Sequence, residues 1–153
     1  QLSVEYLLTS GDPDRLFSPT NTLGGNQAGT DDWSFSAWGF RNTGLVLAPR
    51  LSNLGMVGMG ASTFPFNQHP QFEELKVGTN FYVYHKQQDQ AAISDGLSLQ
   101  EDRYVGSELD LFVNWRITSD IALTVLYGIF GPGDAFADQS DRQLFFTGLT
   151  LNF

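Results

Sequence analysis

The sequence predicts an all-β protein, specifically a transmembrane antiparallel up-and-down β-barrel. Three observations predict this fold: six segments alternate apolar and polar residues with a period of two, their connections alternate between short and long, and the last segment ends on an aromatic residue, Phe153. Only every second residue of a barrel strand faces lipid, so a chain that is 41% hydrophobic is compatible with a membrane barrel. No stretch approaches the roughly 20 apolar residues that a spanning helix needs.

The first three strands are expected at about residues 1–10, 53–64 and 74–86. Their apolar face consists of Leu2, Val4, Tyr6, Leu8, Val57, Met59, Ala61, Leu75, Val77, Thr79, Phe81 and Val83. Polar or small residues occupy most of the alternate positions. Period-2 alternation of this kind is typical of strands that present one face to an apolar environment and the other to a polar one.

The last three strands are expected at about residues 104–117, 121–130 and 142–153. Their apolar face consists of Val105, Leu109, Leu111, Val113, Trp115, Ile121, Leu123, Val125, Tyr127, Ile129, Phe145, Thr147, Leu149, Leu151 and Phe153. A tight turn at 118–120 pairs Ile117 with Ile121 and sets Arg116 opposite Ala122. Because a slip of one residue would exchange the two faces, this parity specifies the register.

The connections alternate in length along the chain. Short turns are expected at 67–71 and 118–120, a long polar connection at 87–103 and a connection of medium length at 131–141. Membrane barrels combine short periplasmic turns with long extracellular loops. If Phe153 is periplasmic, residues 11–52 form a long extracellular loop within one barrel segment that spans residues 1–153.

Six strands are too few for a closed single-chain membrane barrel, in which eight is the usual minimum. We expect the chain to supply the six C-terminal strands of a larger barrel. The alternative is a complete eight-stranded barrel, with two further strands at 32–40 and 45–50 and a turn at 41–44. Pro49 and the shortness of the second piece count against this alternative.

Composition and motifs exclude several classes of function. The formal net charge of −9 argues against binding to nucleic acid, and the absence of cysteine excludes disulfides and thiolate-ligated metals. His69 and His85 lie far from any nucleophile, and no phosphate-binding or calcium-binding loop is present. We therefore expect no enzyme activity, no catalytic residue, no metal site and no cofactor. Acidic loop residues could contact lipopolysaccharide through bridging divalent cations.

The two faces of the strands define the candidate functional residues. The polar face is expected to line the lumen of the barrel and to contact the transported solute through Lys76, Arg116, Glu74, Glu108, Asp110, Asn80, Asn114 and Glu5. Lys76 and Arg116 are the candidates for guiding an anionic solute. The lipid-facing and assembly residues are expected to be Trp115, Tyr127, Leu149, Leu151 and Phe153, with aromatic side chains at the membrane interfaces.

Several stretches carry a resemblance to a known family. They are residues 42–54, the run Tyr104 to Leu111, the run Trp115 to Asp120, the stretch Tyr127 to Phe136 and the final strand, which reads FFTGLTLNF. Their order resembles the C-terminal third of the alginate-export family of bacterial outer-membrane barrels. The resemblance implies a barrel of roughly 18 strands whose charged lumen passes an anionic polysaccharide. Phe153 also resembles the terminal signal that the barrel-assembly machinery reads.

The chain departs from that family in length and in its few lumen-facing basic residues. The sequence therefore predicts an outer-membrane channel that passes polar or anionic solutes, with polysaccharide export as the narrower hypothesis. Its expected partners are outer-membrane lipid, lipopolysaccharide, the assembly machinery, and the remaining strands or another chain that completes the wall. The alternatives are a plugged barrel with a structural or adhesive role and a soluble β-barrel binding module.

Overall fold

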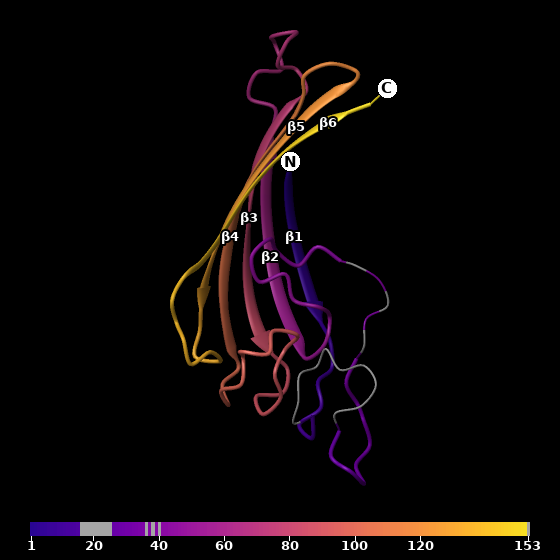
Figure 1. The fold of residues 1–153 in the computed structure, drawn as a ribbon, viewed down its shortest axis with the longest axis vertical. Helices are drawn as coiled ribbons and strands as arrows, with labels where there is room; N and C mark the ends of the chain where they lie inside the picture. The colour runs from indigo at the N-terminus through magenta and orange to yellow at the C-terminus, as the bar shows by residue number, and fades with distance from the viewer. Residues whose placement is uncertain (16–25, 36, 38, 40, 153) are drawn as a thin grey trace.

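The chain forms a single six-stranded antiparallel sheet. The structure is a computed structural model that describes residues 1–15, 26–35, 37, 39 and 41–152. The strands follow one another across the sheet in sequence order (Figure 1). They are β1 (Leu2–Leu8), β2 (Leu54–Thr63), β3 (Leu75–Lys86), β4 (Tyr104–Arg116), β5 (Ile121–Pro132) and β6 (Arg142–Leu151). None of the described residues forms a helix long and apolar enough to cross a membrane.

The expected strands and their register are confirmed. Each lies within about two residues of its expected bounds, because period-2 alternation marks a strand along its whole length. Arg116 pairs with Ala122 across the β4–β5 turn, as the parity argument required. The backbone N–H of Ile117 donates to the carbonyl of Ile121 at 2.9 Å and closes that turn.

The connections divide the sheet into two ends. Residues 64–74 and 117–120, together with both chain termini, lie at one end, which we call the short-turn end (Figure 1). Residues 9–53, 87–103 and 133–141 lie at the other, the long-loop end. The connection at 64–74 is longer than the turn expected at 67–71, because β2 ends at Thr63 and Pro65, which follows closely, cannot donate to the ladder.

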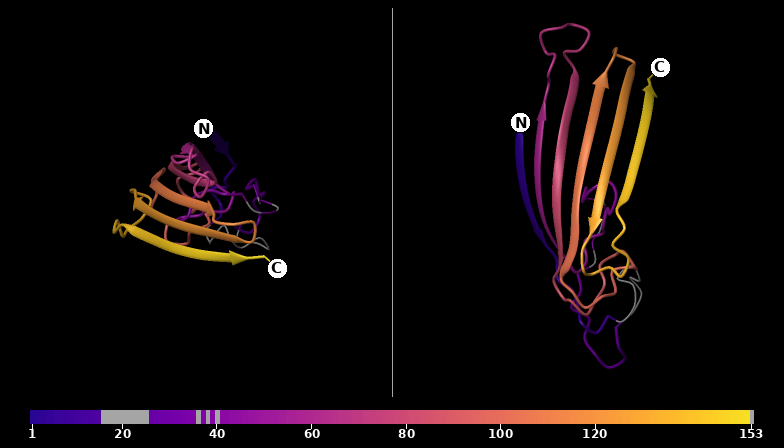
Figure 2. Two further views of the ribbon diagram at one scale, coloured as in Figure 1. Left: turned by 90° about the horizontal axis from the view of Figure 1, so that it is seen from above. Right: turned by 90° about the vertical axis from the view of Figure 1, so that its left-hand side faces the viewer.

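One face of the sheet is apolar and exposed, and we call it the outer face. It carries the expected apolar positions, with Leu2, Tyr6 and Phe145 exposed by 85%, 69% and 68%. The opposite, inner face carries the polar positions of the strands, and the long loops gather beside it (Figure 2). Phe153 lies outside the described residues.

The sheet is curved but not closed. β1 and β6 are its two edges, and no pairing joins them among the described residues. The eight-stranded alternative finds no support: residues 45–47 form bends, residues 48–50 belong to no strand, and the described residues of 32–40 contain no strand. Pro49, which cannot donate to a ladder, and the positive φ of Ala48 keep residues 48–50 out of a strand.

The hydrophobic core sits on the inner face at the long-loop end. It is built from Leu47, Leu54, Met56, Tyr82, Tyr84, Ile93, Val105, Phe130, Ala135 and Phe136. Loop residues therefore fold back over the strands rather than away from them. Val105 was expected on the outer face but points inward, because the register shifts between Tyr84 and His85, opposite Gly106 with its φ of 139°.

Candidate functional site

The structure places the expected lumen residues on the inner face in two separate groups. Glu5, Asn80, Glu108 and Asp110 lie toward the long-loop end, where Glu5, Tyr82 and Glu108 belong to one row across the sheet. Lys76, Asn114 and Arg116 lie on the strands near the short-turn end, and Glu74 lies directly before β3. The two groups have different surroundings.

Glu108 is the centre of the first group and is only 1% exposed. Its Oε1 accepts hydrogen bonds from the backbone N–H groups of Leu45 at 2.5 Å and Val46 at 2.8 Å, and its Oε2 accepts one from Leu47 at 2.8 Å. A carboxylate that accepts three N–H groups in a buried place makes strong, charge-assisted hydrogen bonds. Glu108 thus holds residues 45–47 against the inner face.

Other contacts hold the rest of residues 41–53, which we call the inner segment. The Tyr84 hydroxyl donates to the carbonyl of Thr43 at 2.7 Å, and the Arg41 guanidinium donates to Glu5, with Nε at 2.7 Å. Gly44 has a φ of 118°, and a Cβ there would lie 2.4 Å from the Tyr84 hydroxyl. Glycine is therefore required where the inner segment crosses the strands.

Asp110 is the neighbour of Glu108 on the same face but has a different environment. It is also 1% exposed, and neither of its carboxylate oxygens accepts a hydrogen bond from any described residue. Gly128 lies beside it, and a Cβ there would be 2.8 Å from Asp110 Oδ1 and 3.3 Å from Leu45 Cβ. A buried carboxylate without donors is costly, so Asp110 contributes polarity to the site without stabilising it.

The second group, at the short-turn end, is open to solvent. Arg116 and Glu74 form an ion pair at 3.7 Å in which both side chains are more than half exposed. The Thr124 hydroxyl donates to Asn114 Oδ1 at 3.1 Å. Lys76 makes no ion pair with the described residues. Side chains this accessible are able to meet a solute that reaches the inner face.

An apolar row separates the two groups, and the sequence did not predict it. Gly78, Phe112, Leu126 and Phe146 are register partners on the inner face between the row of Asp110 and the row of Asn114. Phe112 covers Gly78, where a Cβ would lie 2.3 Å from its ring. The inner face is therefore not a continuous polar surface.

Three basic residues of the site were also missed by the sequence reasoning. Arg41 belongs to the inner segment, and Arg142, which pairs with Asp95 at 2.6 Å, lies on the inner face at the start of β6. Lys86 Nζ donates to the carbonyl of Gln100 at 2.6 Å and fastens the loop 87–103. The parity of Lys86 and Arg142 in their strands would have identified them, but no local pattern points to Arg41.

The outermost part of residues 9–53 has its own polar cluster. Burial raises the pKa of Asp12, but hydrogen bonds from the backbone N–H groups of Trp33 and Asp14 lower it on balance. The Arg15 guanidinium donates to Asp32 at 2.6 Å and lowers the pKa of that carboxyl to about 2. Within the described ranges, no three His, Cys, Asp or Glu side chains lie together as metal ligands.

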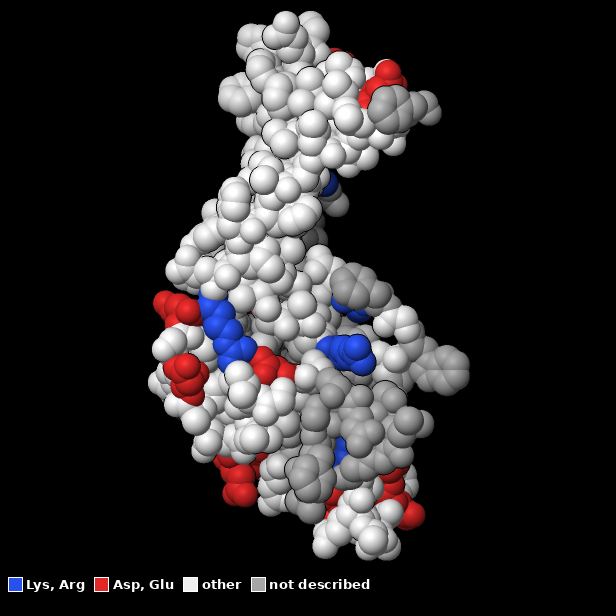
Figure 3. Space-filling view, in the orientation of Figure 1, with Lys and Arg blue, Asp and Glu red and all other residues white. Residues whose placement is uncertain are grey.

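Charged groups are unevenly distributed over the molecule. On the face shown in Figure 3, nearly all visible Lys, Arg, Asp and Glu atoms lie over the long-loop end. Among the residues expected to face lipid, Leu149 and Leu151 are exposed on β6, and Trp115 and Tyr127 share their face. The strand region therefore presents an apolar band, and the loops present the charge.

Comparison with known proteins agrees with this arrangement. A family model described as "Alginate export" matches residues 1–148, which is nearly the whole chain. No individual curated protein matches the sequence.

Proposed function

Since this chain belongs to the alginate-export family of outer-membrane β-barrels, we propose that it forms part of the wall of a channel that passes polar or anionic solutes. The family assigns a role in transport across the outer membrane at a coarse level. The identity of the solute and the roles of single residues belong to this proposal. An anionic polysaccharide is the solute class that the family suggests first.

The observation that carries the proposal is the two-sidedness of the sheet. The exposed large hydrophobic residues of the outer face extend from Leu2 and Val4 at one edge to Leu149 and Leu151 at the other. A soluble β-domain would enclose such a face in a core, whereas a membrane barrel presents it to lipid. The inner face, with its polar side chains, is then the face toward the lumen.

The positions of Lys76 and Arg116 favour an anionic solute as the one that passes the short-turn end. Both lie on the inner face near the rim, and the ion pair of Arg116 with Glu74 is exposed and weak. An entering polyanion can therefore replace Glu74 as the partner of Arg116 at little cost. Glu74 and Asn114 would contribute hydrogen bonds and spacing.

The position of the inner segment indicates that the channel is narrower at the long-loop end. It lies across the inner face between β1 and β5, held by Glu108, Tyr84 and Glu5. In a closed barrel this backbone occupies part of the lumen. We propose that the inner segment sets the width of the channel at the long-loop end.

The free edges of β1 and β6 support the participation of further strands. An exposed strand edge presents unpaired N–H and C=O groups, which a membrane does not tolerate. We propose that strands outside these 153 residues pair with both edges and complete the wall. Lipopolysaccharide and the assembly machinery remain the expected partners of the loops and of the final strand.

Single-channel recording of the completed barrel in a planar bilayer tests the proposal. We expect discrete conductance steps that a polyuronate blocks more strongly than a neutral glucan of the same length. Charge reversal at Lys76 should weaken that block, whereas charge reversal at Arg103, which is exposed directly before β4 at the long-loop end, should not. Absence of conductance would overturn the channel and favour a plugged barrel with a structural role.

A further inference from the structure

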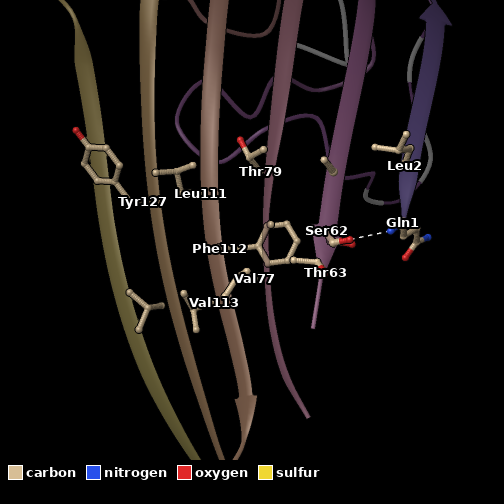
Figure 4. A pocket seen from close by; sticks show the side chains of 13 residues that line it. Gln1, Leu2, Ser62, Thr63, Val77, Thr79, Leu111, Phe112, Val113 and Tyr127 are labelled. Carbon is tan, nitrogen blue, oxygen red and sulfur yellow. Dashed lines mark hydrogen bonds between the residues drawn. The ribbon is translucent and has the colours of Figure 1, made fainter. Parts of the chain in front are cut away.

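Two hollows lie on opposite faces of β1, β2 and β3. The hollow of the outer face is lined mainly by apolar side chains such as Leu2, Val77 and Leu111, and it is part of the wall that meets lipid (Figure 4). The other, which we call the inner hollow, lies on the inner face beside Arg41. Its volume of about 440 Å³ is within the range of about 300–1,000 Å³ that ligand pockets occupy.

Two glycines of β2 form the floor of the inner hollow. A Cβ at Gly60 would lie 2.6 Å from both Asn80 Oδ1 and Ser3 Oγ. A Cβ at Gly58 would lie 3.0 Å from the Tyr82 ring. Side chains at these two positions would therefore displace the walls of the hollow. Glycine in the interior of a strand weakens the strand, and it often marks a place where a ligand approaches the backbone closely.

Hydrogen-bonding side chains form the walls of the inner hollow. Ser3 and Asn80 flank Gly60 in one row across the sheet, and Tyr82 lies in the next row. An asparagine amide supplies two N–H donors and an acceptor oxygen, and a serine or tyrosine hydroxyl both donates and accepts. The hydroxyl groups of a sugar ring also donate and accept. The lining of the hollow therefore matches a ring that carries several hydroxyl groups.

The charge of the inner hollow is balanced. Among its described lining residues, Arg41 and Glu5 alone carry charge, and Arg41 donates to Glu5 through both Nε and Nη2. The Arg116–Glu74 pair at the short-turn end is looser, with 3.7 Å between the two groups. A carboxylate in the hollow would compete with Glu5 for Arg41 and be repelled by it, whereas a neutral ring can bond to both partners.

We propose that the inner hollow binds one neutral pyranose ring of a saccharide in the lumen. This site deepens the proposed function and rests on it, because the inner face must line a channel for a solute to reach the hollow. The ring hydroxyls would bond to Ser3, Asn80 and the Arg41–Glu5 pair, above the glycine floor. The two ends of the inner face then recognise different features of a saccharide, charge near Lys76 and hydroxyl groups at the inner hollow.

Calorimetric titration of the completed barrel in lipid nanodiscs with maltohexaose and cellohexaose tests the site. At least one of these neutral hexasaccharides should bind the wild type. Asn80→Ala and Ser3→Ala should weaken that binding about tenfold and about threefold, because the amide offers more hydrogen bonds than the hydroxyl. Ser62→Ala makes the same change as Ser3→Ala on the same face outside the inner hollow, and should bind as the wild type does.

Glu5→Gln tests the charge balance, because it leaves Arg41 without its carboxylate partner. A hexauronate should bind this variant about tenfold more tightly than it binds the wild type, since a guanidinium makes strong hydrogen bonds to a carboxylate. The neutral hexasaccharides should bind the two proteins within about twofold of each other. Unchanged affinity for the hexauronate would contradict the charge balance of the site.

Failure of both neutral hexasaccharides to bind the wild type would overturn the site, and so would equal binding by the wild type and Asn80→Ala. Single-channel conductance of the same preparations separates this site from the proposed function. Conductance without saccharide binding contradicts only the inner hollow. Saccharide binding that Asn80→Ala weakens, in a barrel without conductance, contradicts only the channel.

Discussion

The residues of the inner face were all expected to line one lumen, yet the two ends of that face differ in burial and in the contacts that their side chains make. At the long-loop end Glu108 and Asp110 are buried beneath the inner segment, beside a hydrophobic core that includes Tyr84 and Phe130. At the short-turn end Lys76, Asn114 and Arg116 remain accessible, and their contacts are weak. The same alternating pattern thus produces a closed region and an open one.

The difference shows that strand parity assigns a face, but the loops determine what that face does. Every expected inner-face strand residue is on the correct side, because the pleat alternates side chains along each strand outside the bulge at Gly106. Only the residues that a loop covers become buried anchors. The open residues are left to interact with solute, so selection by charge and control of width are expected at opposite ends of the channel.

Removal of the Glu108 carboxylate should have the largest effect. Glu108→Ala leaves the N–H groups of Leu45, Val46 and Leu47 without acceptors, and hydrogen bonds to a charged group contribute about 1.5–3 kcal/mol each. We expect loss of at least about 3 kcal/mol of unfolding free energy together with a larger unitary conductance. Lys76→Ala is the control, and an unchanged conductance in Glu108→Ala would contradict the account.

A methyl group at Gly44 should have the next largest effect. A Cβ there would lie 2.4 Å from the Tyr84 hydroxyl and 2.6 Å from Glu108 Oε1, in addition to the strain of a positive φ. We expect Gly44→Ala to cost about 2–3 kcal/mol, measured by urea unfolding in lipid vesicles. Gly29→Ala is the matched control, because Gly29 also has a positive φ, +90°, but its Cβ would meet nothing within 4 Å.

The expected cost of Gly29→Ala is about 1 kcal/mol, which is the backbone strain alone. Equal costs at the two glycines would show that the inner segment does not lie against Tyr84 and Glu108.

Replacing the Asp110 carboxyl with an amide should change the unfolding free energy in the opposite direction to the same replacement at Glu108. Asp110 accepts no hydrogen bond from the described residues, so Asp110→Asn removes a buried carboxyl group beside Glu108 without removing a hydrogen bond. We expect a gain of about 1 kcal/mol, whereas Glu108→Gln should lose about 1–3 kcal/mol because an amide nitrogen cannot accept an N–H. Destabilisation by both substitutions in the same unfolding assay would refute the distinction.

The outer polar cluster should respond to acid within a defined range. The folded-state pKa of Asp32 is about 2, below its ordinary value of 3.8, so its contribution is complete above pH 4. That contribution is lost as the pH falls from about 4 toward 2, because protonation then removes the hydrogen bond from Arg15.

The hydrogen-exchange protection factors of residues 26–35 should therefore fall over this pH range in the wild type. In Asp32→Asn the protection factors should not depend on pH over the same range. Asp31→Asn is the neighbouring control and should behave as the wild type. A wild-type loop that stays protected down to pH 2 would show that the Arg15–Asp32 pair does not hold it.

Charge changes at the open end should have the smallest effect on stability. Arg116→Ala removes an exposed ion pair, so we expect a loss below about 0.5 kcal/mol. Ion selectivity should nevertheless move toward cations, which reversal-potential measurements in a salt gradient detect. A large loss of stability with unchanged selectivity would place Arg116 in a structural role instead.

The strands and their pairing were predictable because their determinants are local. Period-2 alternation fixes the faces, and the tight turn at 118–120 fixes the register of β4 and β5. The prediction that the Val105 side chain points outward was wrong, because a bulge at Gly106 adds one residue and reverses the parity beyond it.

The inner segment was not predictable in the same way. Its attachment to the sheet depends on backbone N–H groups that donate to Glu108. Every residue except proline has such a group, so the sequence does not mark these donors. The local sequence signals are Gly44 and the apolar triplet Leu45, Val46 and Leu47 that follows it. Those signals indicate burial without identifying the strand that the segment contacts.

A disulfide between the inner segment and β5 tests the central claim most directly. The chain contains no cysteine, and the Leu45 Cβ lies 3.3 Å from the Cβ position of Gly128, close to the separation that a disulfide requires. Leu45→Cys with Gly128→Cys should oxidise in the membrane to a cross-linked form of altered gel mobility. Leu45→Cys with Gly148→Cys, at the open end of the inner face, should remain reduced. Equal cross-linking of the two pairs, or none in either, would contradict the account.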